Sequence, residues 1–262
     1  MQTTTFPPLR PLTLRPVTLR LVAAACVAWQ CAAADALFAA EQSPTASADQ
    51  AELTALGYKP LFNGKSLDGW SNPYDHGKAE VVDGEIHLNA DKKFFLVADG
   101  EYGDFELVAD ILLPAGEANS GVMFRCHVEP NRVYGYQAEC DGSDRCWSGG
   151  LYDEGRRQWV WPSTKGRSEP EFLKYEAESQ EWFKRPEVHD ALRRDGWNRY
   201  EIQCRGDHIV IRLNGVKVTD LKDSTDAKGR IAIQHHGEKG KTYRFRNVMI
   251  KELPAAPAGE ET

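Results

Sequence analysis

Residues 198–221 read NRYEIQCRGDHIVIRLNGVKVTDL and indicate the fold class. Their alternating apolar and polar runs are interrupted by two tight-turn pairs, Gly206-Asp207 and Asn214-Gly215. Alternation with a period of two is typical of strands, and such pairs form two-residue hairpin turns. The stretch therefore predicts three consecutive antiparallel strands.

The same pattern continues on both sides of this stretch. Short alternating segments separated by turn signals are found at 79–82, 85–89, 105–113, 121–128, 133–141, 198–205, 208–213, 216–221, 229–236 and 242–253. Ten or more short strands predict an all-β protein, a two-sheet antiparallel sandwich or jelly roll. One segment breaks the pattern. Residues 169–194 are charged and helix-permissive, so we expect a surface insertion within 163–195 that contains one or two short helices.

Composition excludes several other classes of protein. The chain has 262 residues, of which 41% are hydrophobic and 27% charged, which is typical of a globular protein and not of a disordered or collagen-like one. Residues 1–34 contain three arginines and no acid, so the remainder carries 39 acidic residues against 29 basic ones. A net negative charge of this size repels phosphate backbones, and we do not expect nucleic-acid binding.

The N-terminus has the pattern of an export signal. Three arginines precede a short apolar run at 21–29, which Ala32-Ala33-Ala34 follows. A basic region, an apolar core and a small-residue site describe a secretory signal peptide. We expect a periplasmic or extracellular protein, cleaved near Ala34 or Ala40. The apolar run is too short for a stable membrane span, and an uncleaved anchor is the alternative.

Around the main domain, 58–253, we expect a tether at 35–57 and a tail at 254–262. The mature chain keeps Cys126, Cys140, Cys146 and Cys204. An even number of cysteines in an exported protein permits disulfides, and buried free thiols are the alternative. No C-x-x-C spacing indicates a zinc site.

Polar side chains are expected to share one face of two strands. Because residues i and i+2 of a strand point the same way, Gln137, Glu139 and Asp141 share a face of 133–141. Gln234 and His236 share the polar face of 229–236 by the same rule. A solvated sheet face explains such residues equally well.

A hairpin between 121–128 and 133–141 would bring further residues together. Its turn would lie at Asn131-Arg132. Arg125 is then expected near Glu139, as a functional group or as a cross-strand ion pair. Cys126 would lie near Cys140 on the opposite face.

Aromatic residues accompany these polar groups. They are found in Trp147-Ser148-Gly149-Gly150-Leu151-Tyr152 and Trp159-Val160-Trp161. Sugar rings stack on indole, and sugar hydroxyls bind planar polar groups such as amides and carboxylates. The pattern therefore favours a carbohydrate site, with core or rim packing as the alternative role of the tryptophans.

Longer motifs resemble those of one known family. The chain resembles the DUF1080 family, also called the 3-keto-disaccharide hydrolase domain, from about Tyr58 to Leu253. The opening motif is Leu61-Phe62-Asn63-Gly64-Lys65-Ser66-Leu67-Asp68-Gly69-Trp70. The motifs that follow, in the family's order, include Asn119-Ser120-Gly121-Val122-Met123-Phe124-Arg125, Gly135-Tyr136-Gln137-Ala138-Glu139, Gly229-Arg230-Ile231-Ala232-Ile233-Gln234-His235-His236 and Phe245-Arg246-Asn247-Val248.

The resemblance implies a concanavalin-A-like jelly roll with one concave sheet face. It also implies that this face is lined by Arg125, Gln137, Glu139, Tyr152, Gln234 and His236. The long insertion and the cysteines at 140 and 146 depart from the family pattern. The insertion would then roof the binding groove and change the substrate range.

The family's activity implies cleavage of glycosides oxidised at C3, by elimination or hydrolysis. A base would remove the acidic C2 proton, and the C1 leaving group would depart. We expect Glu139 or His236 to be the base. Arg125 would stabilise the enolate or orient Glu139, and Tyr152 or the other titratable group would protonate the leaving oxygen. The expected substrate contacts are Gln137, Gln234, Asp141 and Trp147.

Several alternatives stay open at this point. A divalent cation would be a suitable electrophile, but hard cations need more oxygen ligands than the pattern places. A retaining glycosidase needs two carboxyl groups about 5 Å apart, and Glu139 and Asp141 share a strand face with backbones about 6–7 Å apart, so this mechanism also stays open. A non-catalytic sugar-binding module with the same fold, or a tethered adhesion domain, would need no base. An oxidoreductase partner would have to supply a keto-sugar substrate.

Overall fold

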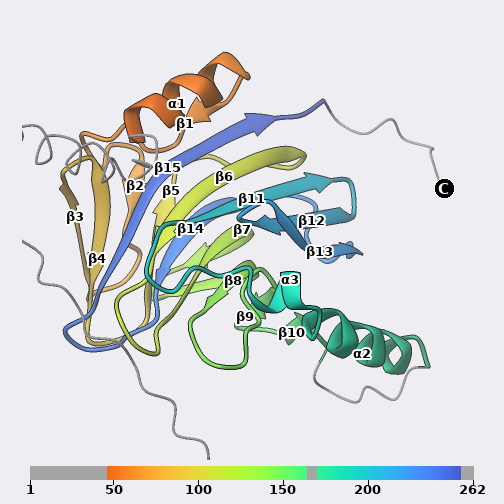
Figure 1. The fold of residues 1–262 in the computed structure, drawn as a ribbon. Coiled ribbons are helices and arrows are strands. Elements are labelled where there is room, and N and C mark those ends of the chain that lie inside the picture. Colours follow the sequence, from red (N-terminus) through yellow and green to blue (C-terminus); the bar gives the residue numbers. More distant parts are fainter. Residues whose placement is uncertain (1–45, 164–169, 255–262) are drawn as a thin grey trace, which may run out of the picture. The chain divides into compact units, whose positions relative to one another are not determined.

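Two antiparallel sheets make up the part of the chain that the computed structural model describes, residues 46–163 and 170–254 (Figure 1). Sheet A follows the order β13 (Val216–Lys222), β12 (His208–Leu213), β11 (Asn198–Arg205), β6 (Phe105–Leu112), β15 (Thr242–Glu252), β4 (Glu85–Asn89) and β3 (Lys78–Val82), with β1 (Lys59–Pro60) paired to β15. Sheet B follows the order β10 (Gln158–Trp161), β9 (Leu151–Glu154), β8 (Arg132–Asp141), β7 (Asn119–Glu129), β14 (Arg230–His235), β5 (Phe94–Ala98) and β2 (Trp70–Ser71). The predicted all-β sandwich is confirmed.

The core lies between the two sheets. It is built from apolar side chains at alternate strand positions, all nearly inaccessible to solvent, such as Leu107, Ile202, Ile211, Phe245, Val122, Phe124, Ala138 and Ile233. Alternation thus leaves the residues between them to face away from the core. In sheet B, this second side is called the outer face below.

Half of the outer face of sheet B is apolar. Phe95 and Val97 of β5, Ala232 of β14 and Met123 of β7 form a buried cluster there, and Tyr74 packs against it. The hydroxyl of Tyr74 accepts a hydrogen bond of 3.0 Å from the backbone N–H of residue 133 on β8. Tyr74 therefore connects the apolar cluster with the start of β8.

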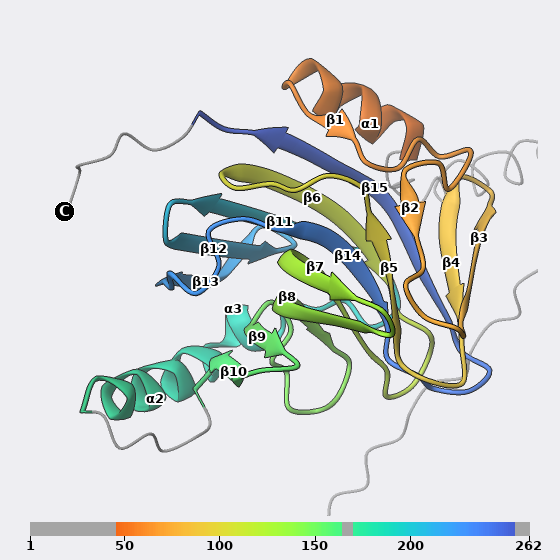
Figure 2. The same ribbon diagram turned by 180° about the vertical axis from the view of Figure 1, so that it is seen from behind.

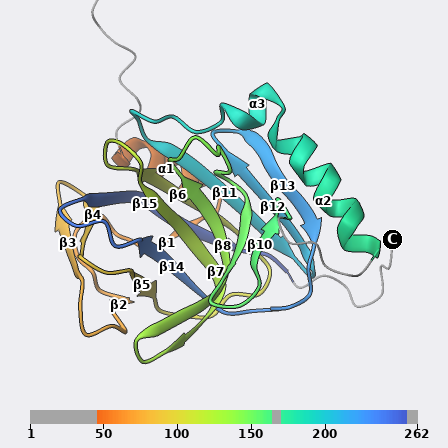
Figure 3. The same ribbon diagram turned by 90° about the horizontal axis from the view of Figure 1, so that it is seen from below.

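The predicted helical insertion is confirmed. Its helices are α2 (Pro170–Phe183) and α3 (Pro186–His189), which run beside β12 and β13 (Figure 3). Phe183 and Val188 are buried in the core cluster and attach the insertion to the sandwich. Because α3 contacts β13, the edge strand of sheet A, the insertion lies where β10 and β13 end the two sheets.

The expected tether is wrong over its second half, because α1 (Ala46–Ala55) is a helix that packs on β15. Its Asp49 is buried and accepts a hydrogen bond of 2.9 Å from Arg199 of β11. Leu53 packs against Val108 and Met249. The predicted leader at 1–34, the rest of the tether up to residue 45 and the tail from residue 255 lie outside the described residues.

The four cysteines of the described part of the chain are free thiols. The expected neighbourhood of Cys126 and Cys140 is wrong. Cys126 belongs to the cluster on the outer face of sheet B, whereas Cys140 belongs to the core. A bulge in β7 between Phe124 and His127 shifts the alternation of the strand and explains the difference. No helix within the described ranges is long and apolar enough to cross a bilayer.

Candidate functional site

A row of aligned residues crosses the outer face of sheet B. The Cα register places Gln137 of β8 opposite Met123 of β7 on one side and opposite Tyr152 of β9 on the other. Tyr152 in turn lies opposite Trp159 of β10. The strands β5, β14, β7 and β8 run side by side through this sheet (Figure 2). The row therefore leads from the apolar cluster, through an amide, to an aromatic edge.

Glu139 is the central acid of this face. Its Oε1 accepts a hydrogen bond of 2.5 Å from Nδ2 of Asn119 on β7, and its Oε2 accepts one of 2.6 Å from Nε2 of Gln137. The residue is only 4% exposed. From the core side, the hydroxyl of the buried Tyr200 donates a hydrogen bond of 2.8 Å to the backbone oxygen of Glu139. Both ends of the residue are therefore held in place.

Burial raises the pKa of Glu139 to about 7. Burial disfavours the charged form because it removes water from the carboxylate. The hydrogen bonds from Asn119 and Gln137 and the positive charge of Arg145 oppose this shift, while the negative charge of Asp141 adds to it. A carboxyl group with a pKa near neutrality can accept and return a proton at physiological pH.

Two glutamine amides continue the polar half of the face. Nε2 of Gln137 lies 3.4 Å from Oε1 of Gln234 on β14. Oε1 of Gln137 is buried and has no hydrogen-bond partner in the described residues. A buried acceptor without a partner is costly, and a ligand hydroxyl or an ordered water would satisfy it. The structure brings Gln137, Glu139 and Gln234 together on this face.

Gly121 makes room for the Gln137 side chain. A Cβ atom at Gly121 would lie 2.6 Å from both Cδ and Cγ of Gln137. Gly121 and Glu139 are Cα partners in the ladder between β7 and β8. The glycine of the Asn-Ser-Gly motif therefore lets an amide lie across the backbone beside the central acid.

Aromatic side chains form the edge of the site at β9 and β10. Trp159 packs edge-on against Tyr152, with ring centroids 5.2 Å apart, and against Trp147, with centroids 5.0 Å apart. The guanidinium of Arg145 lies 4.8 Å from the ring centroid of Trp147 and 5.0 Å from that of Trp159. Burial raises the pKa of the Tyr152 hydroxyl, and the negative charge of Glu154 adds to the rise, so Tyr152 stays protonated.

Asp141 ends β8 two residues beyond Glu139. Its Oδ2 forms a 2.7 Å ion pair with Arg145, and its Oδ1 accepts a hydrogen bond of 3.0 Å from the backbone N–H of Ser143. The backbone of Asp141 exchanges hydrogen bonds with the hydroxyl of Ser148. Asp141 therefore holds Arg145 and the loop after β8 beside the site.

His236 lies just past the end of β14 and joins the site through a chain of contacts. Its Nδ1 is 3.0 Å from Oε1 of Glu238, and the hydroxyl of Tyr243 donates to Oε2 of Glu238 at 2.6 Å. Tyr243 accepts a hydrogen bond of 3.3 Å from the backbone N–H of Asn119. Burial alone would raise the pKa of Glu238, but its hydrogen bonds, that from Tyr243 above all, lower it. Within the described residues, this chain of contacts links His236 to Glu139 through Asn119.

Arg125 is not part of this site, and the expectation that it lies beside Glu139 is wrong. Arg125 adopts a positive φ of 45° at the bulge of β7, which turns its side chain to the other side of the sheet. It is 1% exposed and donates hydrogen bonds to the backbone oxygens of Gly103, Gly206 and Asp226. Its role is to fasten loops to the sandwich.

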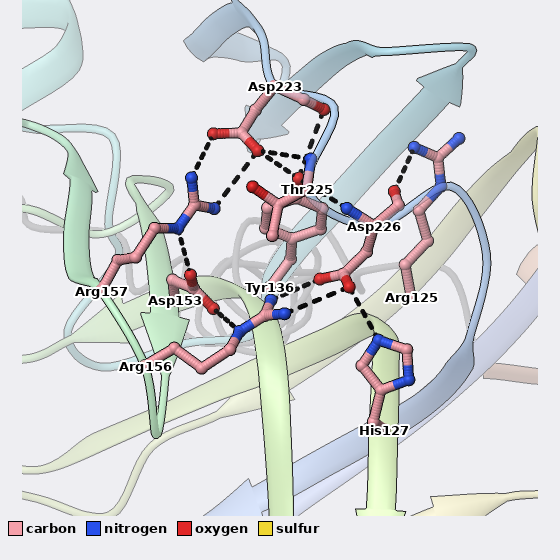
Figure 4. Close-up of polar contacts among 9 residues, drawn as sticks. All are labelled: Arg125, His127, Tyr136, Asp153, Arg156, Arg157, Asp223, Thr225 and Asp226. Atoms are coloured by element: carbon pink, nitrogen blue, oxygen red, sulfur yellow. Dashed lines mark hydrogen bonds and ion pairs between the residues drawn. The ribbon is translucent and has the colours of Figure 1, made fainter.

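The loop that Arg125 holds belongs to a network of buried charges (Figure 4). Asp153 is inaccessible to solvent and accepts bonds from Nε of both Arg156 and Arg157. Arg156 also forms an ion pair with Asp226, and Arg157 donates a hydrogen bond of 2.7 Å to Asp223. Each carboxylate is paired with an arginine, so the network links the turn after β9 to the loop before β14.

Sequence reasoning missed two members of the site. Asn119 stands in the Asn-Ser-Gly motif, but its role depends on the register, which pairs it with Asp141 and so places it diagonal to Glu139. Arg145 lies in a loop with no periodicity, so no pattern could place it.

Within the described ranges, no three His, Cys, Asp or Glu side chains converge on a point where they could hold a metal ion.

Comparisons with known proteins agree with this fold. A carbohydrate-binding module, CBM66, from Bacillus subtilis superimposes with a TM-score of 0.50 and 18% identity, covering 70% of this chain and 96% of the module. A Parabacteroides distasonis protein provisionally described as a glycosyl hydrolase gives a TM-score of 0.51 and 18% identity, covering 78% and 97%. At this identity the likeness concerns the fold alone.

No curated protein sequence matches the chain. At the level of families, residues 57–251 match the 3-keto-alpha-glucoside-1,2-lyase-like domain, which is three quarters of the chain and includes both sheets. The predicted resemblance is thereby confirmed. This chain belongs to the 3-keto-alpha-glucoside-1,2-lyase-like domain family.

Proposed function

We propose that the protein cleaves glycosides oxidised at C3 by elimination, with Glu139 as the base. The observation that carries this proposal is a buried carboxyl group with a pKa of about 7, held by two amides on the outer face of sheet B. A sugar-binding surface needs amides and aromatic rings, but it does not need a base tuned to neutrality.

The chemistry follows from the ketone. The C3 carbonyl acidifies the proton on C2, and Glu139 in its charged form takes that proton. The electrons of the broken C2–H bond form a C1=C2 double bond as the C1–O bond breaks. The leaving oxygen then needs a proton, and the products are an unsaturated keto-sugar and a free alcohol.

Other residues of the site have supporting roles in this proposal. Tyr152 stays protonated at neutral pH and lies one strand from Gln137, which makes it our choice as the proton donor. Arg145 replaces Arg125 as the residue that stabilises the enolate, because its positive charge acts on Glu139. Oε1 of Gln137 is buried and has no hydrogen-bond partner among the described residues, so we assign it as an acceptor for a sugar hydroxyl.

His236 is a weaker candidate for the base than Glu139. Its side chain is half exposed, and its ring is paired with Glu238 in its own loop. We propose that it orients Asn119 through Glu238 and Tyr243. Asp141 is a poor nucleophile for a retaining mechanism, since both of its carboxylate oxygens are already engaged.

A second candidate function is non-catalytic carbohydrate binding. The aromatic edge formed by Trp147, Tyr152 and Trp159 favours it, since such rings stack on sugars. The structural neighbour from Bacillus subtilis is itself a carbohydrate-binding module. In that case Glu139 would be a contact and not a base.

The test compares a 3-keto-disaccharide with its unoxidised parent. We expect the wild-type protein to release the leaving sugar only from the keto compound, and the Glu139→Gln variant to bind the compound without cleaving it. Equal binding of both compounds, with no release by either protein, would support the binding module instead.

The setting of this reaction is also a proposal. The N-terminal pattern supports export, so the substrate would be met in the periplasm or outside the cell. A reaction that oxidises the C3 hydroxyl of a glycoside must precede this one, because the C2 proton is not acidic without the ketone.

A further inference from the structure

A cavity of about 370 Å³ lies next to the end of β8, and none of the residues assigned a role in the proposed reaction lines it. One wall comes from the loop after β8 and includes Asp141, Cys146 and Ser148. The other wall comes from the insertion, residues 188–194, and includes α3. Its volume falls in the range of about 300–1,000 Å³ that is typical of small-molecule sites.

The cavity is connected to the central acid through β8, although Glu139 does not line it. Asp141, which lines it, is two residues beyond Glu139 on the same strand and therefore about 7 Å along the chain. Two linked sugar rings are long enough to span this distance. A sugar ring bound at Glu139 would thus place an adjoining ring at the mouth of the cavity.

The walls of the cavity contain both apolar and polar surface, which matches the two kinds of surface on a sugar. Leu192 is partly buried and supplies apolar surface, which suits the C–H face of a pyranose ring. His189 and Asp190 supply polar atoms for hydroxyl groups, and their side chains are about half and three-quarters exposed.

The insertion is fastened to the opposite wall. Arg194 donates hydrogen bonds to the backbone oxygens of Gly142 and Ser143 and lies 3.4 Å from Asp144. These contacts hold the cavity walls at a fixed separation, which lowers the entropic cost of binding.

We propose that this cavity is the subsite for the leaving sugar and that the insertion sets its specificity. The inference rests on the proposed function. A 3-keto-disaccharide oxidised on its non-reducing ring has only one neighbouring ring, and that ring is the leaving group. With the reacting ring at Glu139, the ring beside it is the one that departs.

The test varies the leaving group at constant reacting sugar. The substrates are a 3-keto-disaccharide and the methyl glycoside of the same 3-keto sugar, whose leaving group cannot fill the cavity. The variants are His189→Ala, which removes a polar wall, and Leu192→Phe, which narrows the space. Glu187→Ala is the matched control, since Glu187 is an exposed residue of α3 that does not line the cavity.

We expect both cavity variants to raise KM for the disaccharide about tenfold, equivalent to about 1.4 kcal/mol, and to leave the methyl glycoside unchanged. Equal effects on both substrates, or no effect on either, would overturn the subsite. A thermal unfolding curve excludes loss of folding as the cause.

Binding separates the subsite from the proposed reaction. In the Glu139→Gln background, the affinity for the disaccharide is measured by calorimetry with and without His189→Ala. If wild-type protein cleaves neither substrate but His189→Ala still weakens disaccharide binding selectively, the reaction is wrong and the subsite stands. If the reaction proceeds and His189→Ala leaves binding unchanged, the subsite is wrong.

Discussion

Asn119 on β7 donates a hydrogen bond of 2.5 Å to Oε1 of Glu139 on β8, and the backbone N–H of the same Asn119 donates to Tyr243. One residue therefore links the central acid to Tyr243, Glu238 and His236. The hydrogen bond from the Asn119 side-chain amide favours the charged form of Glu139, which burial would otherwise keep neutral. The balance between these two effects sets the protonation of the proposed base.

Removing that amide should shift the pH dependence of the reaction. In Asn119→Ala the charged form of Glu139 loses a stabilising bond, so its pKa rises above about 7. We expect the rising limb of kcat/KM against pH to move upward by about one unit. Gln203→Ala, which removes an exposed amide on sheet A, is the control and should leave the profile in place. An unmoved profile in Asn119→Ala would mean that Glu139 is not the group that titrates.

Glu139 should also leave a signature in stability. The folded protein keeps the Glu139 proton up to about pH 7, whereas an unperturbed glutamic acid releases it near 4.5. Between these values the folded state binds more protons, so its free energy of unfolding falls as pH rises. Relative to Glu139→Gln, the wild type should lose up to about 3 kcal/mol across this window. Urea titrations of both proteins at several pH values measure the difference, and parallel curves would refute the raised pKa.

Gly121→Ala tests the close approach of Gln137. The added Cβ atom would lie 2.6 Å from the Gln137 side chain and must displace it. We expect a loss of stability of about 1–3 kcal/mol, as for other overpacked sites, together with weaker sugar binding. Gly196→Ala is the matched control, because a Cβ there meets only ordinary contact at 3.9 Å. Full binding by a well-folded Gly121→Ala protein would remove Gln137 from the site.

Arg125 should behave as a structural residue. Arg125→Met leaves the backbone oxygens of Gly103, Gly206 and Asp226 without their donor, and we expect a loss of stability of about 3 kcal/mol or more. Protein that remains folded at low temperature should keep the pH profile of the wild type. A variant with unchanged melting temperature and no turnover would instead return Arg125 to the reaction.

Much of this architecture could be predicted from strand periodicity. The alternation in 198–221 predicts β11, β12 and β13, and the spacing of Gln137 and Glu139 predicts their common face. These predictions succeed because side-chain direction in a regular strand depends only on position. The shared face of Gln234 follows from the same rule.

Irregular backbone explains the failures. One extra residue in the bulge of β7 reverses the direction expected for Arg125 and separates Cys126 from Cys140. Arg145 is placed by a loop, and α1 is short and weakly amphipathic, so neither has a periodic signal. The pKa of Glu139 depends on burial by residues distant in sequence, which no local pattern reports.

The product of a single reaction shows whether the protein cleaves by elimination with Glu139 as the base. A 3-keto-disaccharide is incubated with wild-type protein and with Glu139→Gln, and the products are followed by NMR. We predict that the wild type releases the leaving sugar together with a keto-sugar carrying a C1=C2 double bond, and that Glu139→Gln does so at least about a hundredfold more slowly. Undiminished release by Glu139→Gln, or cleavage of the unoxidised disaccharide at the same rate, would contradict it.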